Sequence, residues 1–174
     1  AEGSFQLTLP NGFPNPIIPE DNQLTWERIE LGKKLFFDPI LSIDSTISCG
    51  SCHKQEFAFA DNSAISPGVQ GRLGFRNSMS LVNVAYHDFF LREGGVPTLE
   101  MQILVPIQDH NEMSFNIVAV AEKLNQDSSY VKASLEAYNR IPDPYVITRA
   151  IASFERTMVS GNSNYDKMLL NESE

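Results

Sequence analysis

The sequence predicts an all-α protein with long irregular loops in its first half. Apolar residues recur at helical spacing in the second half, most clearly at Ile147, Ile151, Phe154 and Met158. No stretch of useful length alternates apolar and polar residues, the pattern typical of a half-buried strand. With 174 residues, of which 42% are hydrophobic, the chain is long and apolar enough to form one domain around its own core.

The chain begins with a proline-rich segment and then a helix. Residues 1–22 carry four prolines, which fix φ and remove backbone donors, so we expect an extended arm over 1–22 and one domain over 23–174. A first helix is predicted from about Thr25 to Phe37, because Leu24, Leu31 and Leu35 mark one apolar stripe. The Asp38-Pro39 pair ends that helix.

Residues 38–97 are rich in Gly, Ser, Asn and Pro and show little periodicity. Loops of this length are uncommon inside a compact domain unless something else organises them. A buried prosthetic group would do so.

Four helices are predicted in the second half. Thr98 can cap one that runs to about Val105, and Ile117, Ala121 and Leu124 define another that ends near Asn125. Val131, Leu135 and Tyr138 mark a third, which follows a cap at Asp127 or Ser128. The last begins at Asp143-Pro144, a cap followed by proline at the first helical position, and is predicted to end at Gly161.

The net charge of the chain limits the classes of partner that it can bind. Thirteen Lys and Arg against 22 Asp and Glu give a net charge of -9, which phosphate repels, so nucleic acid is excluded as a partner. No apolar run approaches the ~20 residues of a membrane span. A basic protein partner or a small neutral substrate fits better. The start of the chain lacks a secretory signal, which leaves open a cytoplasmic protein or a chain numbered after processing.

The chemistry of the sequence is concentrated in Cys49-Gly50-Ser51-Cys52-His53, which contains both cysteines of the chain. This Cys-x-x-Cys-His spacing is typical of c-type haem attachment. Two thiols three positions apart lie on one face of a helical turn and can add to the two vinyl groups of one haem. The adjacent imidazole is then placed under the iron as its proximal ligand.

Three other interpretations of the two cysteines remain open. A thioredoxin-like redox pair needs a βαβ context, which the sequence does not show. A zinc site needs four ligands, and only His87 and His110 remain as nitrogen donors, neither at finger spacing. A disulfide across two residues is strained and rare.

The ligand on the second face of the iron would decide the chemistry, since a sixth protein ligand favours electron transfer and an open position lets a small oxidant bind. The nitrogen candidates are His87 and His110. The thioether candidates are Met79, Met101, Met113, Met158 and Met168. Core packing or solvation explains each of these residues as well as ligation does.

An ordered series of motifs resembles the bacterial di-haem cytochrome c peroxidase family, which also includes the maturase that completes the quinone cofactor of methylamine dehydrogenase. The resemblance runs from about residue 24 to 170. Its motifs are Leu31-Gly32-Lys33-Lys34-Leu35-Phe36-Phe37-Asp38-Pro39, Ile47-Ser48-Cys49-Gly50-Ser51-Cys52-His53, Phe75-Arg76-Asn77-Ser78, Glu93-Gly94-Gly95, Val105-Pro106-Ile107, Asn111-Glu112-Met113 and Ala150-Ile151-Ala152-Ser153-Phe154-Glu155-Arg156-Thr157.

The resemblance implies a cytochrome c-like haem domain with additional helices, in a periplasmic enzyme that reduces hydrogen peroxide to water. The electrons would come from a small cytochrome c or cupredoxin through a second haem domain, whose Cys-x-x-Cys-His motif does not occur in this chain. We therefore expect a truncated chain, in preference to a cleaved product or a natural single-haem relative. A homodimer is also among the partners that the resemblance implies.

The resemblance also implies roles for individual residues. Cys49 and Cys52 would carry one covalent haem c per chain, with His53 as the proximal iron ligand. Glu112 matches the family's distal acid–base glutamate, which moves a proton between the two peroxide oxygens. Asn77 matches a position that contributes to a calcium site between the two domains, where hard oxygen ligands are required.

The sequence departs from the family pattern at two positions. Many members place a histidine in the loop before Arg76-Asn77, where it blocks the resting iron, and Val69 stands there instead. We infer an iron without a sixth protein ligand. Arg92 stands where members usually carry a tryptophan between the two haems, and the only tryptophan is Trp26.

Two alternative functions remain open. One is a mono-haem electron carrier with a methionine such as Met79 or Met101 as the sixth ligand. The other is a di-haem oxidase that acts on a protein side chain, as the related maturase does.

Overall fold

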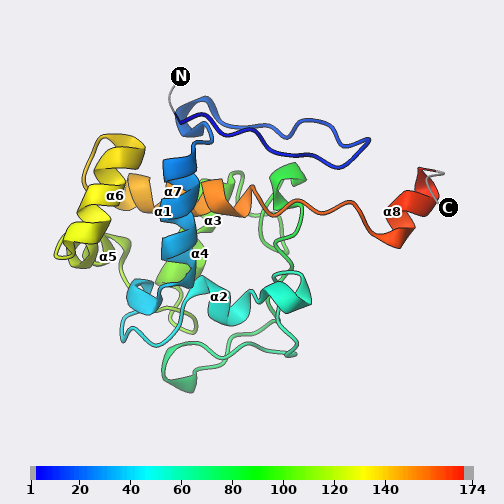
Figure 1. Cartoon of the computed structure of the whole chain (residues 1–174). Coiled ribbons are helices and arrows are strands. Elements are labelled where there is room, and N and C mark those ends of the chain that lie inside the picture. The colour runs from blue at the N-terminus through cyan, green and yellow to red at the C-terminus, as the bar shows by residue number, and fades with distance from the viewer. Residues whose placement is uncertain (1–2, 171–174) are drawn as a thin grey trace.

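The computed structural model describes residues 3–170, and its helices surround one long, nearly fully buried helix. This helix, α7 (Pro144–Glu155), begins at Asp143, whose side chain accepts a hydrogen bond from the Val146 N–H at 2.8 Å. Residues on all of its faces are buried, including Ile147, Ala150 and Ile151. A helix that is buried on all of its faces belongs in the centre of a domain, which is where Figure 1 shows α7.

Helix α1 (Trp26–Phe37) crosses α7 at close range (Figure 1). Thr25 caps α1, and the predicted stripe of Leu24, Leu31 and Leu35 is buried against the core. The crossing depends on Gly32, because a Cβ atom at this position would lie 1.9 Å from the carbonyl oxygen of Ala150. Only glycine lets the two backbones approach so closely.

Within the described residues, five other helices lie around this pair. They are α5 (Ile117–Leu124) and α6 (Ser128–Tyr138) on one side, the short α3 (Leu99–Gln102) and α4 (Leu104–Gln108) beside the irregular loops, and α2 (Cys49–Cys52) below α1. Helix α8 (Asn164–Leu169) lies apart from them, after an extended segment (Figure 1). Five 3₁₀ turns complete the order: η1 (Glu20–Asn22), η2 (Pro39–Leu41), η3 (Gln55–Phe57), η4 (Val69–Gly71) and η5 (Val84–Tyr86).

The predicted fold class is confirmed. Within residues 3–170 the strand content is limited to isolated bridges, for example Pro67 with Leu73 and Phe90 with Val96. The segment 38–97 has the predicted irregular form, interrupted only by single helical turns. Before η1, the arm runs as extended chain across the top of the molecule in Figure 1. Among residues 3–170, the protein has no helix that is long and apolar enough to cross a membrane.

Two predicted helix ends are wrong. The helix expected over 98–105 is interrupted at Ile103 and continues to Gln108. The last long helix ends at Glu155 and not near Gly161, because Asn83 hydrogen-bonds to the chain that follows it. The Asn83 N–H donates to the Met158 carbonyl at 2.8 Å, and its side chain both donates to and accepts from the backbone of Ser160.

Candidate haem-binding cavity

A cavity of about 590 Å³ lies between α2, the irregular loops, α3–α4 and the C-terminal end of α7. Its volume lies in the usual range for a cofactor site. It brings together Cys49, Cys52, His53, Asn77, Met79, His87, Arg92, Glu112 and Met113. Apolar side chains such as Leu81, Val84 and Ile103 form much of its wall.

Helix α2 positions the cysteines and the histidine. The His53 N–H donates to the Cys49 carbonyl at 2.9 Å, so the three side chains leave a single helical turn together. Both cysteines are free thiols. Burial raises the pKa of each thiol, which therefore stays protonated near neutral pH. A thiolate is the form that a redox pair or a zinc site requires, so neither alternative is favoured.

The imidazole of His53 is oriented by the backbone. Its Nδ1 lies 2.8 Å from the Phe59 carbonyl oxygen, which fixes Nδ1 as the protonated nitrogen and makes Nε2 the nitrogen that can bind a metal. Burial lowers the pKa of His53, against the raising effect of the Phe59 and Met79 backbone carbonyls. The ring is thus neutral at physiological pH, as an iron ligand must be.

The part of the chain that the structure describes offers no site of this kind for a bare metal ion. Among residues 3–170, no group of three or more His, Cys, Asp or Glu side chains could hold a metal ion. The donor set of the cavity, two thiols and one oriented imidazole in an apolar wall, instead matches a cofactor that brings its own iron ligands. Haem c fits this set.

Glu112 lies on the turn between α4 and α5. Hydrogen bonds of the backbone hold this turn in its conformation. The Asp109 carboxylate accepts the Asn111 N–H at 2.7 Å, and the Met113 N–H donates to the Pro106 carbonyl at 3.1 Å. Burial, followed by the neighbouring Asp109 charge, raises the pKa of Glu112. The pKa of Glu112 therefore lies closer to neutral pH than that of an ordinary surface glutamate.

The loop that contains Val69 packs against the same turn. The Val69 N–H donates to the Glu112 carbonyl at 2.9 Å, and the valine side chain is fully buried. Gly68 makes this contact feasible, since a Cβ atom there would lie 1.9 Å from the Asn111 carbonyl oxygen. Arg72 holds the two loops together, because its Nη1 donates to the His110 carbonyl at 3.0 Å and to Ser114 Oγ at 3.3 Å.

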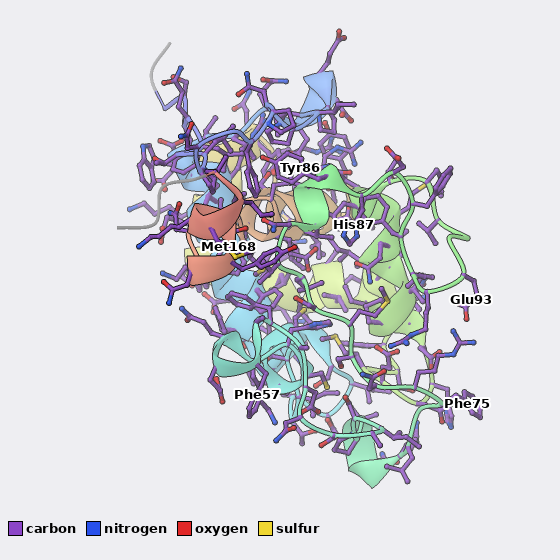
Figure 2. The ribbon with its side chains drawn as sticks, turned by 90° about the vertical axis from the view of Figure 1, so that its right-hand side faces the viewer. Phe57, Phe75, Tyr86, His87, Glu93 and Met168 are labelled. Carbon is purple, nitrogen blue, oxygen red and sulfur yellow. The ribbon has the colours of Figure 1, made fainter. Side chains whose placement is uncertain are left out.

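The other candidates divide between the cavity and the rest of the molecule. Met79, Met113 and His87 line the cavity, and Figure 2 shows His87 beside η5. Met101 is half exposed outside the cavity, His110 is held by Arg72, Met158 lies in the core and Met168 belongs to α8. Trp26 packs on Phe5 at the start of α1 and does not line the cavity.

Asn77 lies at the cavity mouth, where its Oδ1 accepts a hydrogen bond from Arg92 Nη2 at 2.5 Å. Arg76 and Glu93 form an ion pair beside it. A calcium ion at Asn77 would therefore compete with the Arg92 guanidinium. The calcium site stays a prediction.

Glu155 is a cavity residue that the sequence analysis did not single out. It is only 4% exposed, and its Oε2 has no hydrogen-bond partner. The signal was present in the sequence, because Glu155 follows the core residue Ile151 by four positions and so falls on the same buried helix face.

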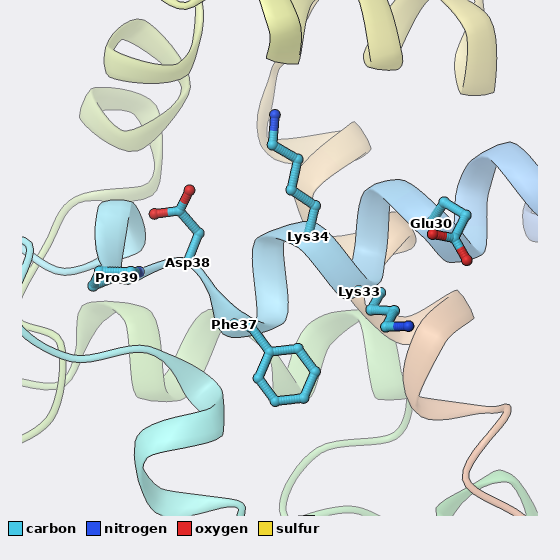
Figure 3. A pocket seen from close by; sticks show the side chains of 6 residues that line it. All are labelled: Glu30, Lys33, Lys34, Phe37, Asp38 and Pro39. Carbon is cyan, nitrogen blue, oxygen red and sulfur yellow. The ribbon is translucent and has the colours of Figure 1, made fainter.

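A second hollow lies on the outer face of α1 and is lined by Glu30, Lys33, Lys34, Phe37, Asp38 and Pro39. Figure 3 shows that these side chains point in different directions. Because no polar groups converge there, the cavity beside α2 is the better candidate site.

A helical domain with paired thiols and a neutral histidine facing one apolar cavity defines the class of c-type haem proteins. The chain belongs to the di-haem cytochrome c peroxidase family, whose sequence pattern matches residues 26–174. The structural neighbours agree with this assignment. A MauG-like protein associated with microbial copper homeostasis superposes with a TM-score of 0.90 and 31% identity, over 98% of this chain and 51% of that one.

Two relatives illustrate the range of the family. The methylamine utilization protein MauG of Methylorubrum extorquens is 31% identical over 94% of this chain and 46% of its own length. The cytochrome c peroxidase Ccp of Escherichia coli is 33% identical over 93% of this chain and 36% of its own length. The chain thus spans less than half the length of these relatives.

Proposed function

We propose that the chain is the peroxidatic c-type haem domain of a cytochrome c peroxidase that reduces hydrogen peroxide to water. The observation that carries this proposal is the single cavity lined by both thiols, the oriented His53 and Glu112. Cys49 and Cys52 would hold one haem c through thioether bonds, and His53 Nε2 would bind its iron. When bound, the haem would supply redox-active iron chemistry, and the electrons would come from a small redox protein.

Glu112 supplies the proton transfer. Its carboxylate accepts the proton from the inner peroxide oxygen and returns it to the outer oxygen, which then leaves as water. The raised pKa of Glu112 suits a group that must both take and give a proton near neutral pH. The hydrogen bonds of Asp109 and Val69 hold the backbone of the turn that carries Glu112.

An open second face of the iron is part of the proposal. Val69 is buried, does not line the cavity and has no atom that can bind iron, so it cannot take the place of a sixth ligand. The backbone carbonyl of Met79 lies against the His53 ring, on the side of the proximal ligand. Met101 lies outside the cavity, which further weakens the electron-carrier alternative.

The exposed side chains at the cavity rim favour a second domain as a binding partner. Phe75 is 88% exposed and Phe89 65% exposed, and both line the mouth. Figure 2 shows Phe75 at the edge of the irregular loops, away from the helices. Exposed aromatic side chains grouped at a mouth mark a contact surface, which the electron-relaying second haem domain would cover. A small cytochrome c or cupredoxin would deliver the electrons, and the compartment would be the periplasm.

The test uses the haem-loaded protein. A mass increase equal to one haem that survives denaturation is expected, with a high-spin ferric spectrum and peroxide consumption supported by a small redox protein. A low-spin spectrum with two protein ligands would refute the open site. Absence of a covalent adduct would refute haem attachment through Cys49 and Cys52.

A side-chain oxidase is the second candidate, favoured by the likeness to the methylamine utilization protein MauG. The two candidates share this domain and differ in the electron source. Rapid peroxide turnover with a small cytochrome supports the peroxidase. Slow turnover with a cytochrome, together with oxidation of a tyrosine or tryptophan in a protein partner, supports the oxidase.

A further inference from the structure

Glu155 and Glu100 are both buried near one guanidinium, that of Arg156, and only Glu100 forms an ion pair with it. Arg156 Nη1 lies 2.5 Å from Glu100 Oε1, and Arg156 Nη2 lies 3.1 Å from Glu100 Oε2. Asn22 Nδ2 also donates to Glu100 Oε1, at 2.9 Å. Glu100 is therefore fully paired. Glu155, the next residue to Arg156, is left with an unpaired oxygen in a buried position.

Burial makes the charged form of Glu155 costly. It raises the pKa of Glu155 to about 8, with the Arg156 charge acting in the opposite direction and the Glu100 charge adding to the increase. A buried carboxyl without a counter-ion of its own keeps its proton at neutral pH. Without the haem, Glu155 is thus a neutral acid. The positive charge that an oxidised haem iron would bring to the cavity favours its ionised carboxylate form, and reduction removes that charge.

Glu155 faces the same cavity as the cysteines. It lines the cavity wall, and it is near enough to Cys49 for its charge to raise the pKa of that thiol. The groups that act on Glu155 are Arg156 on α7 itself, Glu100 on α3 and Cys49 on α2. The other titratable groups that line the cavity are His53, His87, Asp109, Glu112 and the charged side chains of the mouth, Arg76, Arg92 and Glu93.

We propose that Glu155 takes up a proton when an electron enters the haem held by Cys49, Cys52 and His53. One electron passes from the small redox donor to the haem, and one proton passes from solvent to the Glu155 carboxylate. No other bond changes. In the low-dielectric cavity the two added charges compensate each other, and oxidation of the haem releases the proton again. Glu155 acts through the charge of its carboxyl group and is not proposed as an iron ligand or as a contact of peroxide.

This inference rests on the haem attachment of the proposed function but not on peroxide reduction. Its signature is a reduction equilibrium that falls with rising pH, by up to tenfold per pH unit, which equals 59 mV for a one-electron couple. The midpoint potential of this haem is measured from pH 6 to 9 in the haem-loaded protein, in the Glu155→Gln variant and in a Glu136→Gln control. Glu136 is exposed on α6 and changes the net charge equally.

The expected result is a sloping potential in the native protein and the control, and a slope reduced to less than a third in Glu155→Gln. Equal slopes in all three would overturn the inference while leaving the proposed function intact, whereas a protein without covalent haem would refute the proposed function itself. If Glu155→Gln does not fold, the reduced-minus-oxidised infrared spectrum decides. A protonated carboxyl band must appear on reduction in the native protein and shift in Glu155→Asp, and its absence would equally overturn the inference.

Discussion

Replacement of Glu112 by glutamine tests the catalytic proposal most directly. Glutamine keeps the size and polarity of the side chain but cannot carry the peroxide proton. General acid–base catalysis contributes roughly 10²–10⁴-fold, or about 2.7–5.4 kcal/mol at 1.36 kcal/mol per tenfold. Because burial and Asp109 raise the pKa of Glu112 toward the working pH, we expect a loss of about 10³-fold.

The assay is stopped-flow mixing of the ferric haem-loaded protein with peroxide. The matched control is Glu122→Gln, at an exposed position of α5 that does not line the cavity. A Glu112→Gln rate within threefold of the control would refute the reasoning, because the cavity would then cleave peroxide without its carboxylate.

The pH dependence of the same rate has a defined sign. The ionised carboxylate is the base, so the rate rises as pH increases through the raised pKa of Glu112 and then levels off. The Asp109→Asn variant keeps an oxygen to accept the Asn111 N–H but removes the charge that raises this pKa. Its rising limb should move to lower pH, and an unmoved limb would show that another group is titrating.

Three further predictions concern stability and haem attachment. Gly68→Ala should cost about 1–3 kcal/mol in urea unfolding and slow the peroxide reaction, because the new Cβ collides with the Asn111 carbonyl. Glu100→Ala should cost about 3–5 kcal/mol by leaving Arg156 buried and unpaired. Burial alone would raise the pKa of Glu100, but Arg156 lowers it overall, so the native protein should lose this contribution as pH falls through the lowered pKa. Replacement of both cysteines by alanine should abolish the covalent haem mass, while the control variant Ser63→Ala, at an exposed position, should retain it.

Local patterns predicted the helices because each depends on nearby residues. The Thr25 cap, the Asp143-Pro144 start and the apolar stripe of Leu31 and Leu35 act within a few turns of one helix. The end of α7 could not be predicted in this way. It depends on Asn83, which lies more than 70 residues earlier in the chain and hydrogen-bonds to Ser160.

The sequence by itself determined the all-α class, the Cys-x-x-Cys-His turn and the family to which the chain belongs, because these reside in short-range spacing. Only the tertiary structure decided what surrounds that turn. It brought Glu112 to the same cavity as His53, placed Met101 and His110 outside it, and left Glu155 buried with an unpaired oxygen. The physical reason is that burial, and with it the pKa of each carboxyl, is set by neighbours that are distant in the chain.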